Sequence, residues 1–253
     1  MKKMSDKIIK KIKDSEIVIF DVDNTIVDGR MANSALYLID EEKERRNIKN
    51  YVIGIFGGLE VMIGTKLISK LHPENEIRAE NWGLNKTLKI LGKAGIKKER
   101  IQKAAEKYYE KHKIEGIEDL VETFKDDYGL HIWISSSGAD IFLEPVVKKL
   151  GAIGFTSNMT GYSDEIPKKL FPRIRTPEER LKQTHNDIIY HVGYSLPKSI
   201  YIDDSITGLP FKDLVNVFIS SPLAQPEVRR VADIELNKEN GYLWLNEQLK
   251  YSS

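Results

Sequence analysis

Short apolar runs rich in β-branched residues recur along the chain and predict strands. The runs are continuous rather than alternating, which is typical of strands buried on both faces of a parallel sheet. They cover residues 17–20, 130–134, 153–155, 199–202 and 215–219. After residue 126, most of these runs are separated by helical patterns, over residues 139–150 and from Pro177, with Thr176 as N-cap, to Tyr190. This alternation predicts a doubly wound, Rossmann-like α/β core with a parallel sheet.

The segment between the first and second predicted strands carries helical patterns instead. This segment is about a hundred residues long. Loops longer than about 15 residues are uncommon inside compact domains, so the segment must form its own secondary structure. We expect residues 1–29 and 126–253 to form the α/β core domain and residues 30–125 to form an inserted α-helical cap domain. Its predicted helices cover residues 33–49, 59–70, 79–91 and 97–112.

The longest apolar stretch runs from Tyr51 to Ile68 and contains four glycines, with Glu60 near its middle and Lys66 near its end. A membrane-spanning helix needs about 20 mostly apolar residues, and a glutamate at its centre is costly. We interpret this stretch as a buried helix and not as a membrane span. The lysine-rich N-terminus is followed by no apolar core of the length that a secretory signal requires.

Composition excludes several classes of function. Hydrophobic residues make up 41% of the 253 residues, which supplies an ample core, and the net charge is +1. Because basic and acidic residues balance, we expect no nucleic-acid partner and no membrane partner. The chain has no cysteine, which excludes disulfides, thiol nucleophiles, thiolate zinc sites and iron–sulfur clusters and fits a cytoplasmic protein. The oligomeric state has no signature in the sequence.

Paired carboxylates follow the first predicted strand. Asp21 and Asp23 come directly after the buried run 17–20, and two acids at one strand tip repel each other unless a cation lies between them. Ligands of open α/β sheets bind at the carboxyl ends of the strands. This pattern predicts a metal or phosphate site at that edge, although two solvated aspartates in a capped turn are an alternative.

A second pair, Asp203 and Asp204, directly follows the run 199–202. Four carboxylates at two tips of one sheet provide only oxygen ligands, a donor set that favours Mg²⁺ over Zn²⁺. We therefore expect a magnesium site formed by Asp21, Asp23, Asp203 and Asp204.

Hydroxyl groups and one basic side chain are expected to complete an anion site. The run 130–134 leads into Ser135, Ser136 and Ser137, just before a predicted helix, where hydroxyl and backbone N–H groups bind anions well. Lys182 lies on the helix that precedes the run 199–202 and is our candidate for the cation. The competing basic residues are Lys168, Lys169 and Arg175.

Together these residues resemble the haloacid dehalogenase-like superfamily, in its phosphoserine-phosphatase-like branch. The segment from Phe20 to Thr25 looks like the first motif, Asp-x-Asp-x-Thr after an apolar strand. Ser136, with Ser135 as the alternative, looks like the hydroxyl of the second motif. Lys182 looks like the lysine of the third motif, and the segment 203–210 looks like the acidic fourth motif. The resemblance covers the core, at about residues 14–28 and 126–220.

The resemblance implies a Mg²⁺-dependent phosphatase that acts on a small phosphorylated metabolite through an aspartyl-phosphate intermediate. It assigns Asp21 as the nucleophile and Asp23 as the general acid and base. It also implies that Asp21, Asp23, Asp203 and Asp204 surround the metal, and that the phosphate is bound by Thr25, Ser136, Ser137 and Lys182.

The sequence departs from the family pattern at Gly208, where many members carry a second acid four residues after the aspartate of the fourth motif. The adjacent pair Asp203 and Asp204 fits another version of that motif. Two alternative functions keep the same fold: a phosphotransferase or mutase that uses the same intermediate, and a catalytically quiet protein that binds a partner or RNA. The basic helix 97–113 motivates the last, but the Asp21–Asp23 pair argues against it.

Overall fold

The computed structural model describes residues 4–44, 48–71, 76–238 and 241–252. Its elements are, in order, α1 (Asp6–Lys13), β1 (Ile17–Phe20), the short helix η1 (Met31–Ser34), α2 (Ala35–Glu44), α3 (Ile48–Leu71), α4 (Glu76–Lys93), α5 (Lys98–His112), α6 (Ile117–Glu122) and η2 (Thr123–Asp127). They continue with β2 (His131–Ala139), α7 (Asp140–Leu150), β3 (Gly154–Ser163), β4 (Ile166–Phe171), α8 (Pro177–Val192), η3 (Leu196–Lys198), β5 (Ser199–Asp203), η4 (Ile206–Phe211), β6 (Val217–Ser220), α9 (Pro226–Val231), β7 (Ile234–Glu235) and α10 (Gly241–Lys250).

The sheet has seven strands in the order β4-β3-β2-β1-β5-β6-β7. All neighbouring strands are parallel except β3 and β4, which form an antiparallel hairpin. The chain runs outward from β1 through β2 to β3 and then returns to place β5 on the other side of β1. The point where the strand order reverses therefore lies between β1 and β5, which is where open α/β sheets bind ligands.

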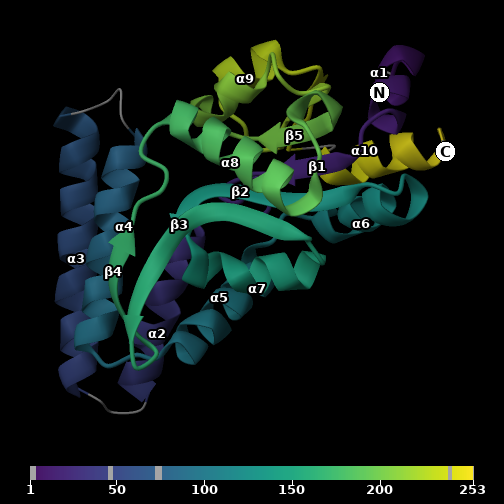
Figure 1. Ribbon diagram of the computed structural model, residues 1–253. Helices are drawn as coiled ribbons and strands as arrows, with labels where there is room; N and C mark the ends of the chain where they lie inside the picture. Colours follow the sequence, from purple (N-terminus) through teal and green to yellow (C-terminus); the bar gives the residue numbers. More distant parts are fainter. Residues whose placement is uncertain (1–3, 45–47, 72–75, 239–240, 253) are drawn as a thin grey trace.

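Helices cover both faces of this sheet (Figure 1). Val18 and Phe20 of β1 pack into the core that includes residues of α1, α7 and α10. Ile17 and Ile19 face the opposite core, which includes residues of α8 and α9. All four residues of β1 are fully buried, as the continuous apolar pattern predicts for a central strand. The doubly wound α/β core is thus confirmed.

The four expected helices between the first two strands correspond to α2, α3, α4 and α5, whereas α6 was not predicted. α3 and α4 lie beyond the end of the sheet, and α5 lies beside α7 (Figure 1). The β3–β4 hairpin, which the sequence analysis missed beyond residue 155, reaches these helices, and β4 packs against α4. Its turn residues Asp164 and Glu165 both have positive φ, at 52° and 64°. Such a turn usually carries glycine or asparagine, so the sequence lacked its normal signal.

The apolar stretch Tyr51–Ile68 forms a helix, as expected, but the prediction that this helix is buried is wrong. α3 packs against α2 and α4, yet several large apolar side chains on it are 37–60% exposed. They are Val52, Ile55, Leu59, Met62, Ile63 and Leu67. Across the described chain, one helix is long and apolar enough to cross a membrane, and it is the stretch Lys49–Ile68, with a mean hydropathy of 1.5.

Candidate active site at the β1–β5 edge

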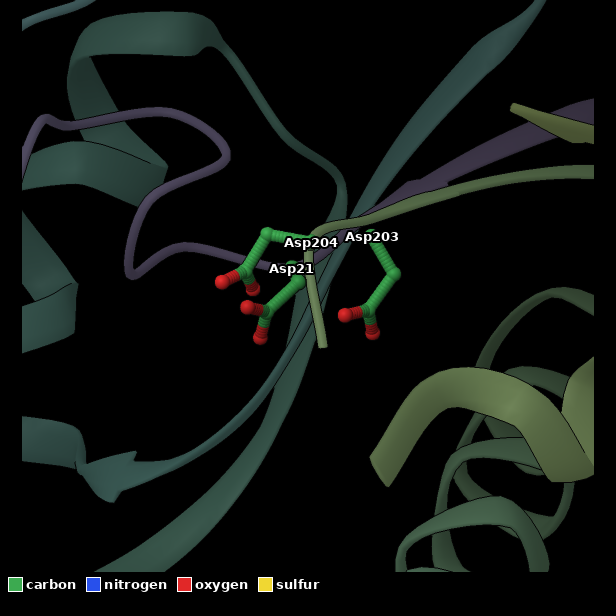
Figure 2. A group of neighbouring side chains, drawn as sticks. All are labelled: Asp21, Asp203 and Asp204. Carbon is green, nitrogen blue, oxygen red and sulfur yellow. The ribbon is translucent and has the colours of Figure 1, made fainter. Parts of the chain in front are cut away.

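The carboxyl ends of β1 and β5 bring three aspartates together. Phe20 pairs in register with Ile202, so Asp21 and Asp203 leave the sheet side by side, and Asp204 follows. Each of the three aspartates offers a carboxylate oxygen within 4.8 Å of the other two (Figure 2). Their exposed fractions are only 6%, 0% and 6% for Asp21, Asp203 and Asp204. A buried cluster of three acids is costly unless cations balance it.

Arg180 of α8 supplies one balancing charge and is itself buried, with 2% exposed. Its Nη2 lies 2.5 Å from Asp21 Oδ1 and donates to the Ser135 carbonyl at 2.6 Å. Its Nη1 lies 3.3 Å from Asp203 Oδ2 and donates to the Thr207 hydroxyl at 3.2 Å. The guanidinium group therefore links the end of β1 to β2, β5 and η4, and it contacts two of the three carboxylates.

The two adjacent aspartates at the end of β5 have different surroundings. Asp203 accepts hydrogen bonds from the Tyr201 hydroxyl at 2.6 Å and from the Ser205 backbone N–H at 2.8 Å, so both of its oxygens have partners. Asp204 accepts one long hydrogen bond, from the Asn24 side chain at 3.3 Å. Burial and the neighbouring Asp203 raise the pKa of Asp204 to about 8. Asp204 is therefore the less satisfied of the two carboxylates.

Asp21 and Asp23 also differ in their surroundings and in what shifts the pKa of each carboxyl group. Burial raises the pKa of Asp21 well above its usual range, Arg180 lowers it, and the other acids raise it again. Asp23 is partly exposed and accepts a hydrogen bond from the Met31 N–H at 2.9 Å. Burial raises the pKa of Asp23 to about 6, against the lowering effect of that N–H group.

The loop after β1 is held from the C-terminal half of the chain. Asn24 adopts a positive φ of 54°, and its carbonyl accepts from the Ser221 hydroxyl at 2.8 Å. The Tyr242 hydroxyl of α10 donates to the Thr25 carbonyl at 2.7 Å. The Thr25 side chain is 0% exposed, and its hydroxyl oxygen has no hydrogen-bond partner among the described residues. A buried polar atom without a partner is unusual and is explained when a ligand supplies one.

The predicted serines lie within β2, which extends to Ala139, and α7 begins at Asp140. Ser135 is fully buried, and its hydroxyl hydrogen-bonds to Thr184 at 2.8 Å. The Ser136 hydroxyl accepts from the Gly138 N–H at 3.0 Å. The Ser137 hydroxyl points to α4, where it donates to Glu80 at 2.8 Å.

The predicted basic residue and the observed one lie on different faces of α8. Lys182 is exposed, as are its competitors Lys168, Lys169 and Arg175, whereas Arg180 contacts Asp21. Lys182 lies two positions after Arg180, which turns their side chains about 200° apart on a helix. Sequence reasoning missed Arg180, although a signal was available: it shares a helical stripe with the buried residues Thr184 and Ile188.

Position 208 requires glycine because a larger residue would collide with the Asp203 side chain. A Cβ atom at this position would lie 2.4 Å from Asp203 Oδ2, and Asp203 cannot retreat because Tyr201 and Ser205 hold it. We expect Gly208→Ala to lower the free energy of unfolding by about 1–3 kcal/mol, measured by urea denaturation. The matched control is Gly58→Ala in α3, whose added Cβ would meet nothing within 4 Å. A helical glycine of this kind gains about 0.5–1 kcal/mol on the same change, so equal effects of the two variants would contradict the prediction.

The basic helix α5 is neutralised by ion pairs along its length. Lys98 lies 2.8 Å from Glu144, Lys103 lies 2.7 Å from Glu99, and Lys107 lies 3.0 Å from Glu41. Three lysines of the helix therefore face acids of this same chain, whereas Lys111 lies over the Tyr37 ring.

Solved structures share this fold. A phosphoserine phosphatase, solved as an analogue of its phospho-aspartyl intermediate, matches with a TM-score of 0.62 and 20% identity, covering 94% of this chain and 98% of that one. A protein of unknown function from Bordetella pertussis Tohama I matches with a TM-score of 0.67 and 13% identity, covering 88% and 99%. A phosphoserine phosphohydrolase-like protein from Francisella tularensis subsp. tularensis SCHU S4 matches with a TM-score of 0.59 and 17% identity, covering 91% and 99%.

At these identities the structures establish the fold alone, and no curated protein matches the sequence. The family follows from the sequence itself. Residues 16–211, which include β1, β2, β5 and every acid of the site, match the haloacid dehalogenase-like hydrolases. The protein therefore belongs to the haloacid dehalogenase-like hydrolase family.

Proposed function

We propose that the protein is a Mg²⁺-dependent phosphomonoesterase that works through an aspartyl-phosphate on Asp21. The observation that carries this proposal is the buried group of Asp21, Asp203 and Asp204 with Arg180, at the point where the strand order reverses. Among the described residues, Arg180 is the cation that pairs with this cluster, and it contacts Asp21 and Asp203, so three ionised carboxylates leave an excess of negative charge in a buried site. A divalent cation and a phosphoryl group together suit such a site.

The donor set fits magnesium. All three acids offer oxygen, the donor that hard cations prefer, and Mg²⁺ is usually held by one or two carboxylates with water and substrate oxygens. Asp21 and Asp204 are the proposed ligands, together with the backbone carbonyl of Asp23. Asp203, whose oxygens already have partners, serves to position Arg180. When bound, the cation neutralises charge on the transferring phosphoryl group.

Asp21 and Asp23, the two acids of the first motif, have different roles in the reaction. An oxygen of Asp21 attacks phosphorus, and the bond from phosphorus to the leaving oxygen breaks. Asp23 donates its proton to that leaving oxygen and then removes a proton from the water that hydrolyses the aspartyl-phosphate. The raised pKa of Asp23, about 6, supports a carboxyl group that is protonated part of the time.

The remaining groups bind the phosphoryl oxygens. Arg180 takes the role that the sequence analysis gave to Lys182, because it contacts the nucleophile. The Thr25 hydroxyl has no partner within the described part of the chain, and we assign the same role to Ser136, which is buried on β2. Helices α2 to α5 act as the cap that excludes bulk water and selects the leaving group.

Removal of the metal tests this proposal. We expect EDTA to abolish phosphate release from p-nitrophenyl phosphate and added Mg²⁺ to restore it. We also expect Mg²⁺ at 100 times its Kd to stabilise the protein by about 2.7 kcal/mol, because it binds only the folded chain. Thermal unfolding with and without Mg²⁺ measures this effect independently of activity.

The matched control for the metal is Asp204→Asn, which should lose both the Mg²⁺-dependent stabilisation and the activity. Full activity in EDTA, or stabilisation by Mg²⁺ that survives in Asp204→Asn, would contradict the assignment. Release of inorganic phosphate distinguishes hydrolysis from a phosphotransferase or mutase, which would hand the phosphoryl group to another acceptor.

A further inference from the structure

A large cavity lies between the helices that follow β1 and the end of β2. Its volume is about 900 Å³, near the upper end of the range for small-molecule sites. Asp23 and Ser137 line one part of it, so the cavity reaches the candidate active site. From there it extends between α2, α3 and α4, and α3 packs against both of the other two helices.

The wall away from the active site is mainly apolar, although Glu42, Asn50, Thr65, Lys66 and Thr87 also line it. It includes Leu36, Leu38 and Ile39 of α2, Val61 and Met62 of α3, and Leu91 of α4. A phosphorylated amino acid or sugar carries charges or hydroxyl groups that would lose hydration against the apolar part of this wall. An apolar group gains free energy in proportion to the surface that it buries.

Polar groups lie at the end of the cavity beside the active site, where they pair with one another. Arg30 lies 3.3 Å from Glu80, and Glu80 accepts from the Ser137 hydroxyl at 2.8 Å. This polar band lies beside Asp23, the proposed proton donor to the leaving oxygen. The cavity is therefore polar at the end where the ester bond would break and mainly apolar beyond it.

We propose that the preferred substrates are phosphomonoesters of long-chain apolar alcohols, whose hydrocarbon part occupies this cavity. The proposal rests on the proposed function and names its substrate class. The phosphate lies at the acidic cluster, the leaving oxygen lies at Asp23, and the chain extends past Arg30 between α2, α3 and α4. Hydrolysis adds water across the P–O bond and releases inorganic phosphate and the free alcohol.

Gly58 of α3 offers a way to test the cavity without disturbing the fold. Three other glycines of α3 are close-approach points, where a Cβ would strike Ile39 of α2 (Gly54), Ile90 of α4 (Gly57) or Trp82 of α4 (Gly64). Gly58 also lines the cavity, but its Cβ would meet nothing within 4 Å. A large side chain at Gly58 should enter the cavity, and the helix should gain from losing a glycine.

The experiment compares kcat/KM for butyl, hexyl, octyl and decyl phosphate, each below its critical micelle concentration, with phosphoserine and p-nitrophenyl phosphate alongside. We expect kcat/KM to rise by up to about fourfold for each added methylene, and decyl phosphate to exceed phosphoserine. In Gly58→Phe, the ratio of kcat/KM for decyl phosphate over butyl phosphate should fall by at least about tenfold.

The matched control is Ile63→Phe on the same helix. Ile63 is 60% exposed and lies outside the cavity lining, so this variant should keep the wild-type ratio. The substrate assignment would be overturned if kcat/KM did not depend on chain length, or if Gly58→Phe left the decyl-to-butyl ratio of kcat/KM unchanged. In either case, hydrolysis of p-nitrophenyl phosphate would still support the proposed function. Absence of hydrolysis for every ester would end the proposed function, and the substrate assignment with it.

Discussion

Replacing Asp21 with asparagine should reduce phosphatase turnover by four orders of magnitude or more. An amide oxygen is a poor nucleophile, and loss of a group that forms the covalent intermediate typically removes most of the rate enhancement. We expect the variant to stay folded, because Arg180 keeps Asp203 as a partner at 3.3 Å. Phosphate release measures the turnover, and circular dichroism verifies the fold.

The matched control for this experiment is Asp28→Asn. Asp28 lies in the same loop and undergoes the same change in charge, but its side chain is exposed. This variant should keep wild-type turnover. Turnover in Asp21→Asn that equals that of Asp28→Asn would exclude an aspartyl-phosphate on Asp21.

Replacing Arg180 with methionine should impair stability as well as activity. Removal of one partner from a buried ion pair leaves its carboxylates without compensation and typically costs about 3–5 kcal/mol. Here Asp21 and Asp203 both lose their contact with the guanidinium group. We expect Mg²⁺ to stabilise this variant more than it stabilises the wild type, because the cation becomes the main balancing charge. Urea unfolding with and without Mg²⁺ measures both effects.

Lys182→Met provides the comparison for Arg180→Met. Lys182 is exposed on the same helix, and surface substitutions usually change the free energy of unfolding by no more than about 0.5 kcal/mol. Phosphate release should be nearly unaffected in this variant. Loss of activity in Lys182→Met with retention in Arg180→Met would reverse the roles that we propose and restore the lysine assignment.

The core of the fold was predictable because buried parallel strands have a continuous apolar pattern that short sequence windows reveal. Residues 17–20 and 199–202 illustrate this, since both runs form central strands that are buried along their whole length. The β3–β4 hairpin was not predictable in the same way. Its turn at Asp164 and Glu165 uses positive φ without glycine, and tertiary packing against α4 supplies what the local sequence does not.

The acidic part of the candidate site could also be anticipated, because Asp21, Asp203 and Asp204 directly follow their strands and strand order brings their tips together. The basic part depends on which face of α8 turns inward. A charged residue on a buried helical stripe contradicts the usual expectation that arginine is exposed, so Lys182 was the more ordinary choice. The exposed apolar face of α3 is a similar case, since apolar composition alone predicts burial.

Synthesis of the chain delivers the parts of the active site at widely separated times. Asp21 leaves the ribosome early, whereas Arg180 follows 159 residues later and Tyr242, whose hydroxyl holds the Thr25 carbonyl, comes 217 residues after Thr25. β1 is also the middle strand of a sheet whose other members are all made after it. β1 therefore has no strand partner until β2 has emerged, and the Thr25 carbonyl gains its contact with Tyr242 only after α10 has been made.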